Sequence, residues 1–224
     1  MDESRRWMLE IFNRSISSDQ PLSWFEDIYA ESNEDRGMIP WDWREPHPFL
    51  VEWAEQNEIT GSALVVGCGL GEDAVFLSKM GWQVTAFDVS ESAVSWARKL
   101  HDVENVEWLV ADLLDPPASW EGEFDLVLEV HILQAIPEEI RKVAAPRLPT
   151  FLAEGGNLVC IGRLSSDEDQ EGPPWPLTQD FIEKIGKDID KIEFYSSMIP
   201  EKESNRYRAV WNKSAKSKSA MSSD

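Results

Sequence analysis

Short apolar runs alternate with amphipathic segments along most of the chain. Five runs have the length and composition of buried strands: Ala63–Gly67, Gln83–Asp88, Val106–Asp112, Phe124–Val130 and Asn157–Arg163. Between them, residues 72–80 and 90–101 place apolar side chains at helical spacing, and Ser90 is suited to cap the second helix. Near-continuous apolar strands that alternate with helices predict a parallel sheet covered on both faces.

The last part of the chain departs from this alternation. After a helix predicted over Thr178–Gly186, the segments 191–198 and 207–213 are two more strands. The short connection between them leaves no room for a crossover helix, so we expect them to pair antiparallel. The predicted fold is α/β: a doubly wound, Rossmann-like sheet of seven strands, mostly parallel, with an antiparallel hairpin at its end.

The pattern also divides the chain into three parts. Residues 1–60 are predicted to form helices and loops, with three prolines in 39–48 that prevent a regular helix there. We expect this part to be a cap that contributes to the site and 61–213 to be the core. The segment 214–224 is small, polar and unpatterned, which predicts a disordered tail.

Composition limits the partners of the protein. The 224 residues include 21 Lys and Arg against 42 Asp and Glu, a formal net charge of −21. Such a charge argues against nucleic acid and against an anionic membrane surface.

The two cysteines, Cys68 and Cys160, and three histidines show no metal-ligand spacing, so we predict no metal site. The first residues lack the pattern of a signal peptide and no apolar run is long enough for a bilayer, so we expect a soluble, cytoplasmic protein. Oligomeric state leaves no sign in the sequence.

A glycine-rich loop, Gly67-Cys68-Gly69-Leu70-Gly71, follows the first predicted strand and opens a helix. Such a loop lets a ligand approach bare backbone, although a tight turn that binds nothing would use the same residues. Asp88 ends the second strand 21 residues after Gly67, where an acid can hold the two hydroxyls of a ribose. Glu72 stands where a dinucleotide site needs its third glycine, and with Asp73 it would oppose a pyrophosphate. The loop therefore favours a nucleoside without phosphates.

Further polar residues stand at the ends of the next strands. Asp112, followed by Leu113, ends the third strand and is suited either to an adenine amino group or to a turn. Glu129 and His131 end the fourth strand, beside the crevice where open α/β sheets bind ligands.

These motifs, in this order and spacing, resemble those of class I S-adenosylmethionine-dependent methyltransferases across residues 61–213. The resemblance implies S-adenosyl-L-methionine as cofactor and S-adenosyl-L-homocysteine as product. It implies the following cofactor-binding residues in the core: Gly67, Cys68, Gly69, Gly71, Asp88, Val89, Asp112, Leu113 and Glu129.

The flanking segments narrow the resemblance. Pro40-Trp41-Asp42 and Gly172-Pro173-Pro174 are similar to segments of thiopurine, thiol and halide methyltransferases and their bacterial relatives, and Leu133–Pro137 is more like an uncharacterised bacterial branch of that group. The resemblance implies that Trp41, and by a less direct match Trp24, contact the cofactor. It also implies a small-molecule acceptor such as a thiol or a halide.

The acceptor side is less constrained. His131 is the candidate for a general base, with a structural histidine as the alternative, and a soft nucleophile would need no base. Trp43, His47 and Trp175 are candidates for acceptor contacts, although core packing explains Trp43 equally well. Two other functions remain open: a non-catalytic S-adenosylmethionine-binding protein and an NAD-dependent oxidoreductase, against which Glu72 argues.

Overall fold

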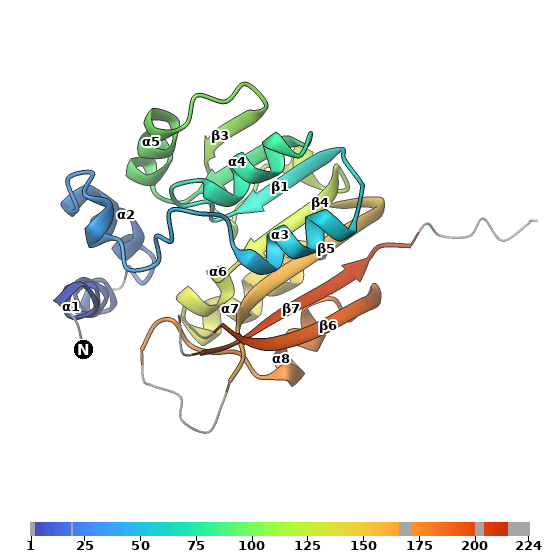
Figure 1. The fold of residues 1–224 in the computed structure, drawn as a ribbon. Helices are drawn as coiled ribbons and strands as arrows, with labels where there is room; N and C mark the ends of the chain where they lie inside the picture. The colour runs from blue at the N-terminus through green and yellow to red at the C-terminus, as the bar shows by residue number, and fades with distance from the viewer. Residues whose placement is uncertain (1–2, 19, 166–171, 200–203, 215–224) are drawn as a thin grey trace, which may run out of the picture.

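The computed structural model describes residues 3–18, 20–165, 172–199 and 204–214. One seven-stranded sheet runs through the molecule in the order β3-β2-β1-β4-β5-β7-β6 (Figure 1). The strands are β1 (Ser62–Val66), β2 (Gln83–Asp88), β3 (Val106–Val110), β4 (Phe124–Val130), β5 (Leu152–Arg163), β6 (Asp190–Ile199) and β7 (Ser204–Asn212). The α-helices are α1 (Glu3–Ser17), α2 (Ser23–Glu31), α3 (Pro48–Gln56), α4 (Glu72–Lys79), α5 (Glu91–Leu100), α6 (Ile132–Ala135), α7 (Glu138–Ala144) and α8 (Gln179–Ile185). Short 3-10 helices cover Arg36–Met38, Ala118–Trp120 and Ala145–Phe151.

The strand pairing confirms the predicted topology. β1 pairs in parallel with β2 on one side and with β4 on the other, and β3 and β5 continue the parallel sheet outward. β7 runs antiparallel to β5 and to β6, which forms the edge. From β1, the chain adds β2 and β3 on one side of the sheet and then β4 and β5 on the other, so the topological switch point lies between β1 and β4. Doubly wound folds bind their ligands in the crevice at this point.

Alternate residues of the central strands face opposite helical layers. In β1, Ala63 and Val65 pack with α3, α4 and α5, whereas Leu64 and Val66 pack with residues of α6–α8 on the other face. Figure 1 shows α3 and α4 in front of the sheet and α7 and α8 behind it. This period of two, buried on both sides, explains why the strands are continuous apolar runs in the sequence.

The helices α1 and α2 form a separate layer over one end of the core (Figure 1). Their apolar residues, including Trp24 and Ile28, share a hydrophobic cluster with Leu70 of the glycine loop and Trp96 of α5. Glu26 of α2 also accepts hydrogen bonds from the Ser90 hydroxyl (2.7 Å) at the start of α5. In contrast, α3 packs on the sheet itself, although the sequence pattern places it in the cap.

Three strand boundaries differ from prediction by two residues or more. β3 ends at Val110, before the predicted end at Asp112, β5 begins at Leu152 rather than Asn157, and β7 begins at Ser204 rather than Tyr207. The early part of β5 contains Gly155 with φ +86°, and the β4–β5 register shifts between Phe124 and Leu126. Because glycines and a register shift interrupt the apolar pattern of β5, its first residues do not have the composition of a strand.

None of the helices in the described ranges is long and apolar enough to cross a membrane. The predicted tail, apart from Ser214, lies outside the described residues.

Candidate active site

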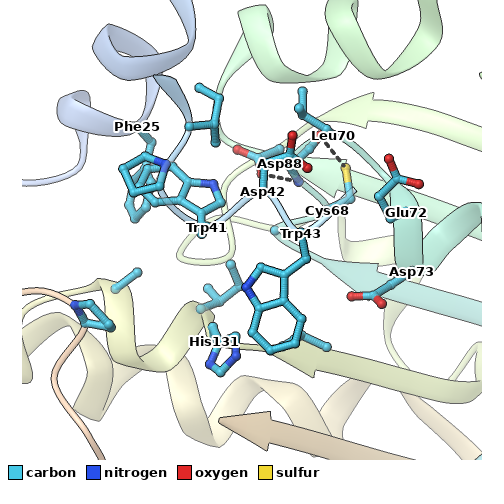
Figure 2. Close-up of a pocket in the computed structure, with 18 of the residues that line it drawn as sticks. Phe25, Trp41, Asp42, Trp43, Cys68, Leu70, Glu72, Asp73, Asp88 and His131 are labelled. Atoms are coloured by element: carbon cyan, nitrogen blue, oxygen red, sulfur yellow. Dashed lines mark hydrogen bonds between the residues drawn. The ribbon is translucent and has the colours of Figure 1, made fainter. Parts of the chain in front are cut away.

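A cavity of about 370 Å3 lies at the carboxyl ends of β1 and β4. The glycine loop forms one wall, the segment 39–47 and α2 form the cover, and His131 and Arg206 line the far end. In Figure 2, Trp41 lies beside Phe25 of α2, whereas Trp43 extends toward His131. The cavity thus joins the predicted cap to the predicted core.

The glycine loop has the backbone that its sequence demands. Gly67, Gly69 and Gly71 have φ of +61°, +53° and +89°, in the left-handed region that other residues avoid. A Cβ on Gly69 would lie 2.8 Å from the Tyr29 hydroxyl oxygen, and one on Gly71 would lie 2.2 Å from the ring of Trp108. The close approach of Tyr29 means that the cap packs directly on the loop backbone.

Asp88 lies beside the glycine loop. Its carboxylate accepts hydrogen bonds from the backbone N–H groups of Gly69 (2.9 Å) and Ser90 (3.0 Å). Burial raises the pKa of this carboxyl, and only 7% of the residue is exposed. Asp88 therefore holds the loop in shape and also lines the cavity.

A smaller pocket of about 60 Å3 adjoins the cavity and shares Gly67 and Asp88 with it. Val89, Asp112 and Leu113 lie in its wall, as do apolar residues of α7. Asp112 accepts a hydrogen bond from the Leu114 N–H (2.8 Å), so it also makes the turn that the sequence offered as its alternative role. An apolar slot with two acids, Asp88 and Asp112, in its lining suits an adenine ring.

The acidic start of α4 is tied to the cap by one arginine. Arg36 donates two hydrogen bonds of 2.6 Å to Asp42 and one of 2.6 Å to Glu72. The Asp73 carboxylate accepts from the His47 backbone N–H (2.8 Å), and burial raises its pKa to about 6. The guanidinium of Arg36 is therefore already paired with the carboxylates of Asp42 and Glu72. It is not available to bind a pyrophosphate, whereas a nucleoside that carries a sulfonium cation needs no such partner.

Three of the predicted tryptophans line the cavity: Trp24, Trp41 and Trp43. Trp41 donates its Nε1–H to the Tyr29 hydroxyl (2.8 Å) and meets Trp24 edge to face at 5.6 Å. Trp43 stacks on the imidazole of His47 at 4.9 Å, with the Arg206 guanidinium 5.4 Å from its ring centre. The tryptophans thus form two groups, one next to the glycine loop and one at the far end.

His131 occupies the far end in a strained conformation, with φ +65°. A guanidinium can only donate, so the contact of 3.0 Å between Arg206 Nη1 and Nε2 makes Nε2 an acceptor. The proton is then on Nδ1, which donates to Gln134 Oε1 at 2.9 Å. Burial, with the charge of Arg206, lowers the pKa of His131 to about 3. Its basic lone pair is already engaged, so this geometry argues against the predicted role of general base.

Two predicted site residues lie outside both pockets. Glu129 is fully buried and accepts from the Leu133 N–H (3.0 Å), so it supports the start of α6 beneath the cavity. The ring of Trp175 packs edge-on against Phe12 at 5.6 Å, close to the guanidinium of Arg141. The geometry therefore argues against direct ligand contact by Glu129 or Trp175.

Tyr29, Arg163 and Arg206 are among the cavity-lining residues that sequence reasoning missed. Tyr29 is one residue of an amphipathic helix and carries no motif. Arg206 and Arg163 are register partners at the β5–β7 pair. The predicted antiparallel hairpin could have identified these two arginines, because it brings the start of the last strand to the carboxyl end of β5. In the described residues, no group of three or more His, Cys, Asp or Glu side chains is placed to hold a metal ion.

The sheet order, the glycine loop after β1, the acid at the end of β2 and the cavity at the switch point define a class I S-adenosylmethionine-dependent methyltransferase. A solved structure of the same fold is 1,6-didemethyltoxoflavin-N1-methyltransferase of Burkholderia thailandensis with bound 1,6-didemethyltoxoflavin and S-adenosylhomocysteine. It has a TM-score of 0.66 and 13% identity, and the match covers 96% of this chain and 92% of that one.

The model of the thiopurine S-methyltransferase family matches residues 31–216, and the chain belongs to that family. Probable thiol methyltransferase 2 of Arabidopsis thaliana is 28% identical over 180 residues, which are 79% of this chain and 76% of the relative. Thiocyanate methyltransferase 1 of Brassica oleracea is 26% identical over 184 residues, or 79% and 81% of the two chains. The protein is thus a methyltransferase with S-adenosylmethionine as cofactor, and the oxidoreductase alternative is wrong.

Proposed function

We propose that this methyltransferase acts on a small, soft nucleophile that binds as an anion, such as a thiolate, thiocyanate or a halide. The observation that carries the proposal is the environment of Arg206 at the far end of the cavity. The relatives named as thiol and thiocyanate methyltransferases support the same class of acceptor.

Arg206 is a buried cation with no acidic partner among the described residues. Only 7% of the residue is exposed, and no carboxylate of the described residues lies within ion-pair distance of its guanidinium. Burial and the nearby Arg163 lower its pKa to about 10, so it remains charged at neutral pH. In a chain with a net charge of −21, an unpaired buried arginine is costly unless a ligand supplies the negative charge.

We assign the cofactor to the other end of the cavity. Backbone of Gly67–Gly71 would contact its amino acid part, and Asp88 its ribose. Val89, Asp112 and Leu113 in the adjoining pocket would hold the adenine. The faces of Trp41 and Trp24 suit the sulfonium cation, an attraction of about 0.5–2 kcal/mol per ring depending on burial.

When bound, S-adenosylmethionine supplies an electrophilic methyl group: the acceptor forms a bond to its carbon while the carbon–sulfur bond breaks and the electron pair stays on sulfur. The residues of the chain then have two tasks, to align the acceptor with that methyl group and to exclude water. Alignment contributes up to about 7–11 kcal/mol in favourable intramolecular models. The cap residues Tyr29 and Trp41, which cover the loop, would supply the exclusion.

An anionic acceptor also agrees with the state of His131. With its Nε2 lone pair engaged by Arg206, His131 is placed to orient the guanidinium rather than to remove a proton. A thiocyanate or halide ion carries no proton to remove, and a thiol would react as the thiolate that forms in solution.

A panel of acceptors tests the proposal. Purified protein is incubated with S-adenosylmethionine and thiocyanate, iodide, a small thiol, a phenol or an amine, and S-adenosylhomocysteine and the methylated product are measured by mass spectrometry. We expect turnover of the soft anions, independent of pH between 6 and 9 for thiocyanate, and loss of most of it in Arg206→Met with partial retention in Arg206→Lys. Cofactor binding without turnover of any acceptor would instead identify a non-catalytic binding protein. Turnover restricted to amines would refute the anionic acceptor.

A further inference from the structure

His47 is held rigidly between the cap and the core. Its backbone N–H donates to Asp73 at the start of α4, and its Nδ1 accepts from the Phe49 N–H (3.1 Å) as the N-cap of α3. Because Nδ1 accepts a hydrogen bond, the ring proton of the neutral imidazole is on Nε2. The local structure therefore decides the tautomer.

The ring Nε2–H of His47 is without a hydrogen-bond partner in the part of the chain that the structure describes. The atom is buried, has no hydrogen-bond partner among the described residues, and belongs to a residue that lines the cavity. The residue as a whole is only 4% exposed. A buried donor that finds no acceptor costs about 1–3 kcal/mol, so an acceptor atom of a ligand would recover that energy.

The surroundings keep this imidazole neutral. Burial, with the charge of Arg206 and the ring of His131 at 5.6 Å, lowers the pKa of His47 to about 2. Trp43 stacks on the ring of His47 at 4.9 Å and also lies 6.3 Å from the ring of His131. The carboxylate nearest in the hydrogen-bond network, Asp73, is bound to the backbone N–H and not to the ring. Because Nδ1 accepts from the Phe49 N–H and the pKa is low, His47 presents a donor rather than a base at neutral pH.

A second unpartnered donor lies at the same end. Arg206 Nε is buried and has no hydrogen-bond partner among the described residues, while Nη1 of the same group is engaged by His131. The guanidinium of Arg206 and the imidazole of His47 lie on the same indole, that of Trp43. Two unpartnered N–H groups beside the same ring suit an atom or group that only accepts hydrogen bonds.

We propose that His47 is a specificity-determining residue whose Nε2–H, together with Arg206, binds an accepting atom of the methyl acceptor other than its nucleophilic atom. The site would favour small anions that carry such an atom, for example the nitrogen of thiocyanate or the carboxylate of a thiol acid, over a single-atom halide. This inference rests on the proposed function, since it concerns the same acceptor.

The kinetic test uses His47→Asn. Asparagine keeps an N-cap acceptor for α3 but removes the Nε2–H, so the fold should be retained. We expect the KM for thiocyanate to rise about ten- to hundredfold, as for loss of a hydrogen bond to a charged group. The KM for iodide and the Kd for S-adenosylhomocysteine should change less than threefold. An unchanged KM for thiocyanate, or equal weakening of all three ligands, would overturn the proposal.

A spectroscopic test is independent of turnover. The chain contains three histidines, so imidazole-¹⁵N-labelled protein gives three rings that His47→Asn and His101→Asn can assign. Thiocyanate is titrated into the S-adenosylhomocysteine complex at pH 7. We expect His47 to show the Nε2-protonated tautomer and its Nε2–H resonance to shift on titration. A shift without turnover would support the inference while the proposed function fails, and no shift at saturating thiocyanate would refute the inference alone.

Discussion

Replacement of Glu129 by glutamine should change how stability depends on pH. The Glu129 carboxyl is fully buried, and one oxygen accepts from the Leu133 N–H while the other has no hydrogen-bond partner among the described residues. The ionisable groups around it are Arg141 of α7, Cys160 of β5 and Tyr207 of β7. Burial outweighs the hydrogen bonds and raises the pKa of Glu129 to about 7.

The magnitude follows from linkage. A carboxyl whose pKa is raised by folding is favoured in its neutral form, so stability falls as the pH rises from the unfolded pKa to the folded one. With values of 4.5 and about 7, the free energy of unfolding falls by about 3 kcal/mol in total, of which about 2.5 kcal/mol falls between pH 5 and pH 8. Glutamine cannot ionise but keeps an acceptor for Leu133, so Glu129→Gln should lose this dependence.

Urea denaturation of both proteins at pH 5 and pH 8 measures the effect. The difference between Glu129→Gln and wild type should shift by about 2.5 kcal/mol in favour of the variant at pH 8. Glu107→Gln, the same chemical change at an exposed position of β3, is the control for the general charge of the protein. If the difference between Glu129→Gln and wild type is equal at the two pH values, the carboxyl is not destabilised by burial and the reasoning is refuted.

Three further variants test the cofactor end. Asp88→Ala removes the proposed ribose ligand and the acceptor for the Gly69 N–H, so the Kd for S-adenosylhomocysteine measured by calorimetry should rise at least tenfold. Unchanged affinity would contradict the assignment of Asp88 to the ribose. Gly69→Ala should lower both the melting temperature and the affinity for S-adenosylhomocysteine, because the Cβ of the alanine meets the Tyr29 hydroxyl. Tyr29→Phe in the same chain should recover part of both losses. No recovery would mean that backbone strain alone is responsible. Arg36→Gln removes the link between the cap and Glu72, so the Kd should rise about fivefold with the circular dichroism spectrum unchanged, and an unaltered Kd would show that the link does not hold the cap over the cofactor.

The fold and one half of the site were predictable because their signals are local. β1 and β4 are apolar runs since both of their faces are covered, and β2 ends at Asp88 as the pattern indicates. The loop Gly67–Gly71 must be glycine-rich because its residues take positive φ and lie against the cap. These requirements act on single residues and their neighbours in the chain, so they can be recognised from the residue types in the sequence.

The roles of the acceptor-side residues were less accessible. The sequence places Glu129 and His131 together at the end of the fourth strand, as candidates for cofactor binding and for a general base. In the structure Glu129 is inside β4 and its carboxylate supports α6, whereas His131 follows the strand with φ +65°. The contact of His131 with Arg206 joins residues 75 positions apart. His47 occupies a proline-rich segment that predicts only a loop, yet its Nδ1 caps α3, the residue lines the cavity, and its buried Nε2 has no hydrogen-bond partner among the described residues.

By itself, therefore, the sequence determined the α/β architecture, the hairpin at its end, the glycine loop with Asp88, and a ligand without phosphates. The net charge of −21 argued against nucleic acid and anionic membrane surfaces as partners. Only the tertiary structure decided that Arg206 lies buried at the cavity without an acidic partner among the described residues. It also decided that Nε2 of His131 accepts a hydrogen bond, whereas the buried Nε2–H of His47 has no partner among those residues. The physical reason is that periodicity and backbone conformation are local properties of the chain. Protonation, burial and pairing depend on which distant segments pack together.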